Sequence, residues 1–93
     1  MKLEWSAEAL ADLDRFAVFL HERYRSLAPL IAQEIIEKAA LLERHPKAGR
    51  AIGDRDEYRQ IVLKVLSAAY VFQYRYDGQR LVMLRVFHGR EAR

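Results

Sequence analysis

Apolar side chains in the first half of the chain recur at helical spacing. Ser6 stands where a helix N-cap belongs. The apolar positions that follow it lie three or four residues apart: Leu10, Leu13, Phe16, Ala17, Leu20 and Tyr24. This spacing predicts a helix over residues 7–25, with Asp12 among the charged residues on its solvent side. A short strand over residues 2–5 is expected before it, because Leu3 and Trp5 alternate with polar residues.

A second helix is expected to begin near Pro29, whose missing N–H costs nothing in a first turn, and to end before Pro46. Its apolar stripe is formed by Ile31, Ala32, Ile35, Ala39 and Leu42. The short link over residues 26–28 predicts that the two helices form an antiparallel hairpin. Each stripe must be buried, and two stripes alone make a thin core, so a further layer is expected to cover them.

The pattern changes after Pro46. Residues 47–57 carry glycines and charged residues and are expected to form a loop. Three stretches rich in β-branched and aromatic residues then predict strands over residues 58–65, 69–76 and 80–87. The predicted order is β-α-α-β-β-β, an α+β fold in which the helical hairpin packs on one face of a mainly antiparallel sheet. Residues 1–93 are expected to be one domain.

Asp77-Gly78 predicts a hairpin between the last two strands. A three-residue loop would place Tyr76 opposite Arg80, and it separates apolar from polar side chains best. The face away from the helices would then carry Gln73, Arg75, Met83 and Arg85, joined by Arg59. The alternate aromatic residues Tyr70, Phe72, Tyr74 and Tyr76 are expected in the core, with stacking on nucleic acid bases as the alternative.

Charge is unevenly distributed along the chain. The formal net charge is only +3, but residues 1–46 hold 6 Lys or Arg against 8 Asp or Glu, whereas residues 47–93 hold 10 against 5. The basic second half indicates an anionic partner, either nucleic acid or an acidic protein segment, unless it is simply a solvated face. No apolar run is long enough to span a membrane and no signal peptide is recognisable, so a cytoplasmic location is expected.

The chain offers little conventional chemistry. It has no cysteine, which excludes disulfides, thiolate catalysis and zinc fingers. Its three histidines lack ligand spacing and its four glycines are scattered, so neither a metal nor another cofactor is expected. What remains is a cluster of Arg75, Arg85, His88 and Arg90. Such a cluster could cleave RNA without a metal, or the arginines could bind acidic residues of a partner beside an ordinary His88.

Five segments resemble those of a known family in order and spacing. They are Trp5-Ser6 with Ala9 and Asp12-Leu13; residues 42–50; residues 58–62; residues 70–75; and residues 84–90. Together they resemble toxins of the RelE/ParE superfamily, the toxin halves of type II toxin–antitoxin pairs. The resemblance implies a fold that agrees with the pattern above. It also implies a cognate antitoxin with which the chain forms a hetero-oligomer.

Two activities occur in this superfamily. RelE-like members cut messenger RNA on the ribosome without a metal, whereas ParE-like members act on DNA gyrase and trap its cleaved DNA complex. The long helical hairpin and the Gly49-Arg50 exit look more like the ParE branch, so gyrase poisoning is the favoured expectation. Messenger RNA cleavage is the alternative, and a third possibility is an interaction module that kept the fold and lost the activity.

The resemblance also implies roles for individual residues. For the RNA-cleaving branch, Arg59 matches a strand arginine that supports phosphate contact, Arg85 matches an arginine that stabilises charge, and His88 falls near a catalytic histidine. In the gyrase branch, five arginines would contact the target or the antitoxin: Arg59, Arg75, Arg85, Arg90 and Arg93. The nucleases often carry more lysine around the middle loop and end with a catalytic tyrosine, where this chain has Glu91, Ala92 and Arg93.

Overall fold

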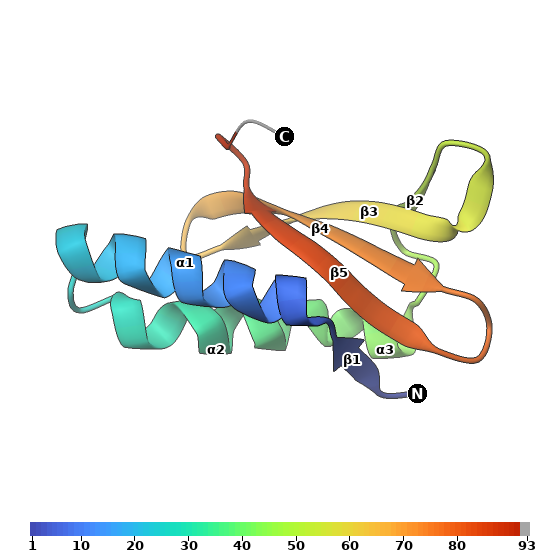
Figure 1. Cartoon of the computed structure of the whole chain (residues 1–93), viewed down its shortest axis with the longest axis horizontal. Coiled ribbons are helices and arrows are strands. Elements are labelled where there is room, and N and C mark those ends of the chain that lie inside the picture. The colour runs from blue at the N-terminus through green and yellow to red at the C-terminus, as the bar shows by residue number, and fades with distance from the viewer. Residues whose placement is uncertain (92–93) are drawn as a thin grey trace.

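A layer of helices lies against one face of a five-stranded sheet in the computed structural model, which describes residues 1–91 (Figure 1). The elements, in chain order, are β1 (Leu3–Trp5), α1 (Ala7–Arg23), α2 (Ala28–Ala39), α3 (Leu41–Arg44), β2 (Arg50–Ile52), β3 (Arg55–Val65), β4 (Ala68–Tyr76) and β5 (Leu81–His88). The strand order is β1-β5-β4-β3-β2, with β1 parallel to β5 and all other pairs antiparallel. The predicted α+β architecture is confirmed.

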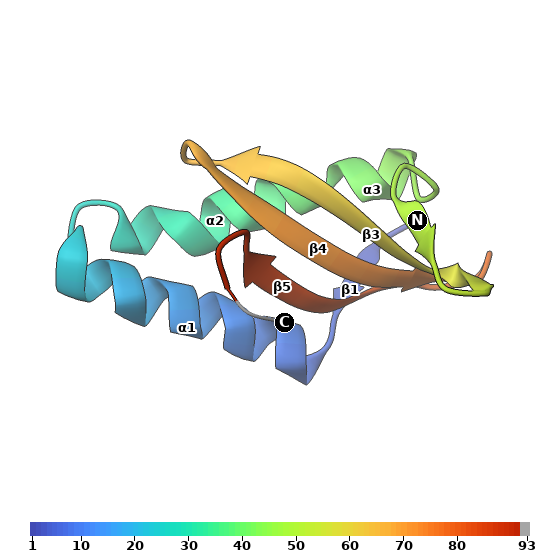
Figure 2. The same ribbon diagram turned by 90° about the horizontal axis from the view of Figure 1, so that it is seen from above.

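The two long helices begin where the sequence predicts. The Ser6 hydroxyl accepts a hydrogen bond from the Ala9 amide at 3.0 Å, which caps α1, and Pro29 occupies the first turn of α2. Their ends differ from the prediction. α1 ends at Arg23, and the expected second helix divides at Ala40 into α2 and the single turn α3. The two helices run antiparallel and extend beyond the sheet at the linking loop (Figure 2).

The buried stripe of α1 differs from the predicted one. Ala9, Asp12, Leu13 and Phe16 face the sheet, whereas Leu10 is 49% exposed. The reason is the helical repeat: a side chain one position after Ala9 points about 100° away around the axis. Asp12, expected on the solvent side, therefore occupies a core position, and it is retained there by hydrogen bonds described below.

The predicted hairpin register between β4 and β5 is wrong. Tyr76 lies opposite Leu81, so the connection has four residues instead of three. Asp77 causes this, because its carboxylate accepts hydrogen bonds from the amides of Gln79 and Arg80 at 2.9 and 2.8 Å and closes a longer turn. As a consequence Met83 is fully buried in the core and does not lie on the outer face of the sheet.

A second irregularity restores the outer position of Arg85. Tyr74 pairs with Met83 but Gln73 pairs with Arg85, so Leu84 is an extra residue at a bulge in β5. The bulge returns Val86 to the core opposite Phe72 and leaves Arg85 beside Gln73 on the outer face. The prediction placed Arg85 on the correct face of the sheet, but it did so from an incorrect register of the β4–β5 hairpin.

The region predicted as a loop over residues 47–57 contains β2 and the start of β3. Gly53 adopts a φ of 64° at the turn between these strands, which a glycine tolerates without steric cost. The pairing also moves Arg59, because it lies opposite Tyr74 and therefore shares the helical face of the sheet. The prediction that Arg59 joins the outer face is wrong.

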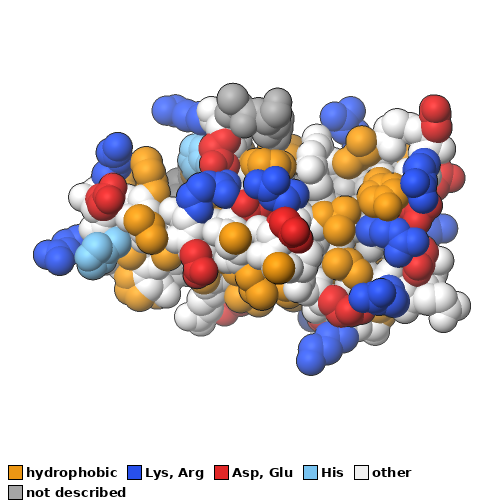
Figure 3. Space-filling model, viewed as in Figure 1, with side chains coloured by type: hydrophobic (Ala, Val, Ile, Leu, Met, Phe, Trp, Pro, Cys, Tyr) orange, Lys and Arg blue, Asp and Glu red, His pale blue; other side chains and the backbone are white. Residues whose placement is uncertain are grey.

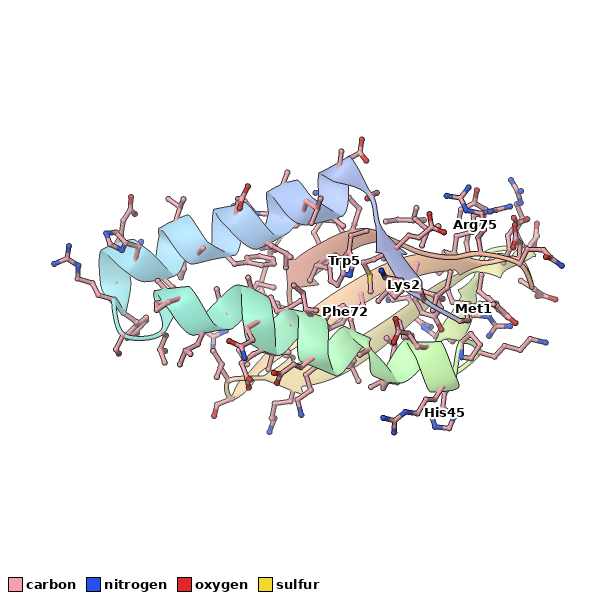
Figure 4. All side chains as sticks on the ribbon, turned by 90° about the horizontal axis from the view of Figure 1, so that it is seen from below. Met1, Lys2, Trp5, His45, Phe72 and Arg75 are labelled. Carbon is pink, nitrogen blue, oxygen red and sulfur yellow. The ribbon has the colours of Figure 1, made fainter. Side chains whose placement is uncertain are left out.

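The aromatic residues of β4 form the centre of the core. Tyr70, Phe72 and Tyr74 are at most 4% exposed, and Phe72 lies where the helical layer covers the sheet (Figure 4). Tyr76 is half-buried at the edge of the same cluster. Their prediction as core residues is confirmed, and none presents an open ring face for base stacking.

Candidate functional site

Most of the arginines on the sheet are held by carboxylates of the same chain. Arg75 contacts Glu57 at 2.7 Å and Asp77 at 3.0 Å, and Arg80 contacts Glu4 at 2.8 Å. Positive and negative side chains accordingly alternate at the right-hand end of the molecule (Figure 3). The hydrogen bond from Arg55 lowers the pKa of Glu57, and the bond from Arg75 adds to this effect. These pairs neutralise much of the positive charge that the sequence concentrates in the sheet.

Asp12 is the charged centre of the contact between α1 and β5. Its carboxylate accepts hydrogen bonds from Arg85 Nε at 2.9 Å, Arg85 Nη2 at 3.0 Å, Arg15 Nη1 at 2.6 Å and the Val86 amide at 2.8 Å. Burial acts to raise the pKa of Asp12, but the bonds from Arg85, Val86 and Arg15 outweigh it and the pKa is lowered. The charge of Arg85 is thus compensated within the fold, and Asp12 satisfies the β5 edge where β1 has ended.

His88 lies at the end of β5 and packs on the core. Its ring meets that of Tyr70 edge to face at 5.1 Å, and its Nδ1 accepts a hydrogen bond from the Arg90 amide at 3.1 Å. A neutral ring that accepts at Nδ1 carries its proton on Nε2. Glu91 accepts a hydrogen bond from the His88 amide and binds Arg15 at 2.8 Å, which ties this end of the chain to α1.

Arg59 supports the backbone of the turn that precedes β2. Its Nη1 donates to the carbonyls of Gly49 at 2.7 Å and Lys47 at 3.4 Å, while its Nε is buried without a hydrogen-bond partner among the described residues. The Tyr74 hydroxyl joins the same turn by donating to the Pro46 carbonyl at 2.8 Å and accepting from the Gly49 amide at 2.9 Å. Burial raises the pKa of this phenol despite the bond from Gly49.

The structure does not bring the three proposed nuclease residues together. Arg59 lies opposite Tyr74 and His88 opposite Tyr70, so they are four positions apart along the sheet, about 13 Å, and two strands apart across it. Arg85 faces the other side of the sheet and is bound to Asp12. Arg90 is exposed beyond the end of β5, and Arg93 lies outside the described residues.

An apolar groove of about 670 Å³ lies at the end of the molecule where the helical hairpin passes beyond the sheet. Its walls come from α1, the start of α2, the turn between β3 and β4, and the end of β5, and they include Phe19, Leu27 and Leu66. Arg23 and Arg90 lie on its rim, and the Arg23 guanidinium rests 4.6 Å above the Phe19 ring. The pattern of apolar residues in the sequence did not predict this groove. Phe19 falls outside the predicted stripe of α1, and this exposed aromatic was the available signal.

Residues 1–91 contain no group of three or more His, Cys, Asp or Glu side chains arranged to hold a metal ion. Within the same part of the chain, no helix is both long and apolar enough to cross a membrane.

Known proteins resemble this chain over nearly its whole length. Residues 3–93 match the model of the ParE toxin of the type II toxin–antitoxin system parDE. Toxin RelE1 of Caulobacter vibrioides is 31% identical over 88 residues, which cover 95% of this chain and 92% of that protein. A chain of the chromosomal ParDE system from P. aeruginosa has a TM-score of 0.75 at 21% identity, with 95% of each chain covered. The structural match supports the fold.

Proposed function

Because the chain belongs to the ParE toxin family of type II toxin–antitoxin systems, we propose that it arrests growth by poisoning DNA gyrase and not by cutting messenger RNA. The predicted membership in the RelE/ParE superfamily is confirmed by the family model and by the relative named Toxin RelE1. Membership of this family implies an antitoxin partner. The choice of target is the part of the proposal that depends on this chain's own residues.

The separation of the nuclease candidates carries the proposal. Metal-free cleavage of RNA needs a base, an acid and cations converging on one phosphate. Here Arg59 holds backbone carbonyls, Arg85 is bound to Asp12, and the Nδ1 of His88 is already bonded to the Arg90 amide. A gyrase poison needs no such assembly, because the enzyme itself cuts the DNA.

Two assays on the purified chain separate the targets. In a supercoiling reaction with purified gyrase, we expect inhibition together with accumulation of linear, protein-linked DNA. In a cell-free translation reaction probed for cuts in messenger RNA, we expect intact transcripts. Gyrase that remains fully active with excess toxin would contradict the proposal, and codon-specific cuts in the second reaction would establish RNA cleavage instead.

The His88→Ala variant gives a residue-level prediction. We expect it to retain inhibition of gyrase within about threefold, because the ring packs on Tyr70, a contact worth only about 0.5 to 1.5 kcal/mol beyond its buried area. The assay is the toxin concentration that halves supercoiling, with His21→Ala on the exposed face of α1 as the matched control. A variant that loses all growth arrest while remaining folded would identify His88 as catalytic and favour the RNase.

The RNase remains the second candidate function because the 31% identical relative is named a RelE toxin. An inactive interaction module is the third reading from the sequence. Expression of the chain alone from a tight inducible promoter tests it, since normal colony counts with confirmed soluble protein would show that the activity has been lost.

We further propose that the antitoxin occupies the apolar groove. Antitoxin segments that fold on binding combine apolar with acidic residues, and the groove offers an apolar floor with Arg23 and Arg90 on its rim. Neither rim arginine has a carboxylate partner among residues 1–91, so both are available to acidic side chains. The affinity of the complex is therefore expected to fall with salt, but less steeply than the affinity of a protein for DNA.

Phe19→Ala tests this placement. We expect the variant to weaken antitoxin binding about tenfold or more, because Phe19 is a large aromatic that is 49% exposed in the free chain and lines the groove. Isothermal titration with the antitoxin measures the effect. Val18→Ala, at the neighbouring position of α1 and 61% exposed outside the groove, is the control and should change the affinity less than twofold. Equal effects of the two variants would contradict the placement.

A further inference from the structure

We propose that the turn following α3 binds the phosphate backbone of nucleic acid. The segment from the last residue of α3 to the first of β2, residues 44–50, is here named the cationic turn and carries Arg44, His45, Lys47 and Arg50. This proposal rests on the proposed function in one respect: the phosphates that the turn contacts are those of the DNA held by gyrase. It concerns a region distinct from the apolar groove, at the opposite end of the molecule (Figure 1).

The cationic turn holds positive charge that the fold leaves uncompensated. Arg44, Lys47 and Arg50 are exposed and form no ion pair with any described residue, in contrast to Arg75, Arg80 and Arg85 on the sheet. Glu43 is the acidic residue beside them, and its carboxylate already accepts a hydrogen bond from the Leu3 amide at 2.7 Å. The cationic turn is therefore a surface where three positive charges stand close together in the sequence without an internal partner among residues 1–91, unlike the paired arginines of the sheet.

The backbone of the cationic turn is fixed from beneath. The Ala48 amide donates to the His45 carbonyl at 3.0 Å, which closes a tight turn. The Tyr74 hydroxyl and the Arg59 guanidinium bind its Pro46, Lys47 and Gly49 backbone groups from the sheet side. His45 points away from the sheet beneath the end of α3 (Figure 4). The turn thus directs these backbone groups towards the sheet and leaves Arg44, Lys47 and Arg50 exposed, with Arg50 opposite Gln60 at the start of β2. Binding would therefore order little backbone.

The composition of this surface favours nucleic acid over an acidic protein segment. A protein segment that folds on binding needs apolar anchors, and the groove supplies these at the other end of the molecule. Between Arg44, Lys47 and Arg50 stand only His45, Pro46, Ala48 and Gly49. Phosphate contacts require cations and little apolar area, because their free energy comes largely from release of counterions. The exposed acids Asp54 and Asp56 lie beyond β2, at the far side of its hairpin with β3.

Fluorescence anisotropy with a short labelled DNA duplex tests the inference, with a single-stranded RNA of equal length as the second probe. The test variant is Arg44→Gln/Lys47→Gln/Arg50→Gln, and the control is Arg25→Gln/Lys38→Gln/Lys64→Gln, which removes the same formal charge at exposed positions elsewhere. We expect the test variant to weaken duplex binding at least tenfold at about 50 mM salt. Its slope of log affinity against log salt should fall by about 2 to 3 relative to the native chain, as expected for up to three lost phosphate contacts. The control should retain the native slope within about one.

Each other outcome has a defined meaning. Equal losses in the two variants, or no measurable binding of either the duplex or the RNA by the native chain, would overturn the inference. So would a test variant that loses antitoxin affinity while it keeps DNA binding, because the turn would then belong to the protein interface. If the chain binds RNA but not the duplex, the turn is still a phosphate-binding site, and the result favours messenger RNA on the ribosome as the target.

The supercoiling assay distinguishes failure of the inference from failure of the proposed function. If the test variant keeps both native duplex binding and full inhibition of gyrase, the inference is wrong and the proposed function stands. If the native chain binds duplex through the cationic turn but leaves gyrase active, the proposed function is wrong and the phosphate site stands.

Discussion

Asp12→Asn is expected to lower the free energy of unfolding by about 2 to 3 kcal/mol at neutral pH. The carboxylate is 1% exposed and accepts four hydrogen bonds, three of them from Arg15 and Arg85. Asparagine preserves the volume but places an N–H₂ group against these guanidinium groups, and breaking a buried charge pair typically costs 3 to 5 kcal/mol. The lower end applies because both arginines are about 40% exposed and can turn towards water.

Urea unfolding of the native chain and the variant measures this effect, with Asp14→Asn as the control. Asp14→Asn is the same chemical change two positions along α1, where the side chain is exposed. It should change the free energy of unfolding by no more than about 0.5 kcal/mol. Similar losses from both substitutions would show that the buried network stabilises little.

The pH dependence of this difference has a definite sign. The pKa of Asp12 is lowered in the folded protein, so its contribution is complete above the unfolded value of about 3.9 and is lost as the pH falls through the lower folded value. The difference in free energy of unfolding between the native chain and Asp12→Asn should therefore be largest at pH 7 and should narrow below about pH 4. A gap that widens in acid would contradict the assignment of Asp12 as an ionised acceptor.

Gly49→Ala is expected to destabilise the fold by about 2 kcal/mol, because an added methyl group has no space. A Cβ at this position would lie 2.8 Å from both the Gln60 carbonyl oxygen and the Tyr74 hydroxyl. The first is backbone and the second belongs to a fully buried side chain, so neither can move freely. Thermal or urea unfolding measures the loss, and a change below about 0.5 kcal/mol would show that the turn can shift without cost.

A double-mutant cycle identifies the cause of the Gly49→Ala effect. Tyr74→Phe removes the hydroxyl that crowds the added methyl group, together with two hydrogen bonds, and should cost about 1 to 2 kcal/mol alone. The double variant should then be less destabilised than the sum of the two, by about 1 kcal/mol, because both changes act on the same contact. Strict additivity would indicate that the clash with Gln60 dominates.

The sequence pattern predicts the elements of this fold better than the details of their contacts. Ser6 and Pro29 mark the helix starts, and the alternate aromatic residues of β4 are in the core, because capping, proline geometry and strand alternation are local properties. The hairpin register is not local in this sense. It depends on the carboxylate of Asp77 and on a bulge at Leu84, and neither leaves a signature in the apolar pattern.

For the charged residues too, the local sequence predicts less than the contacts that the fold creates. A positive second half is visible in the composition, but the partner of each arginine depends on which carboxylate the fold brings beside it. Arg85 meets Asp12 from 73 positions earlier in the chain, and Asp12 has the local appearance of a solvent-facing residue. Consequently the binding candidates predicted from the sequence include Arg75 and Arg85, which the fold pairs with carboxylates, and omit Arg44 and Arg50, which it leaves unpaired.

The parallel pairing of β1 with β5 has a consequence for the synthesis of this protein. β1 and α1 are synthesised before β5. The partners of β1 in the sheet are Leu81 to Met83, and the ion-pair partner of Asp12 in α1 is Arg85. A nascent chain that stops short of β5 has an unpaired first strand, an uncompensated Asp12 and an incomplete core. The domain is therefore expected to acquire its active shape only when β5 has been translated, so an interrupted message should yield harmless fragments and no partial toxin.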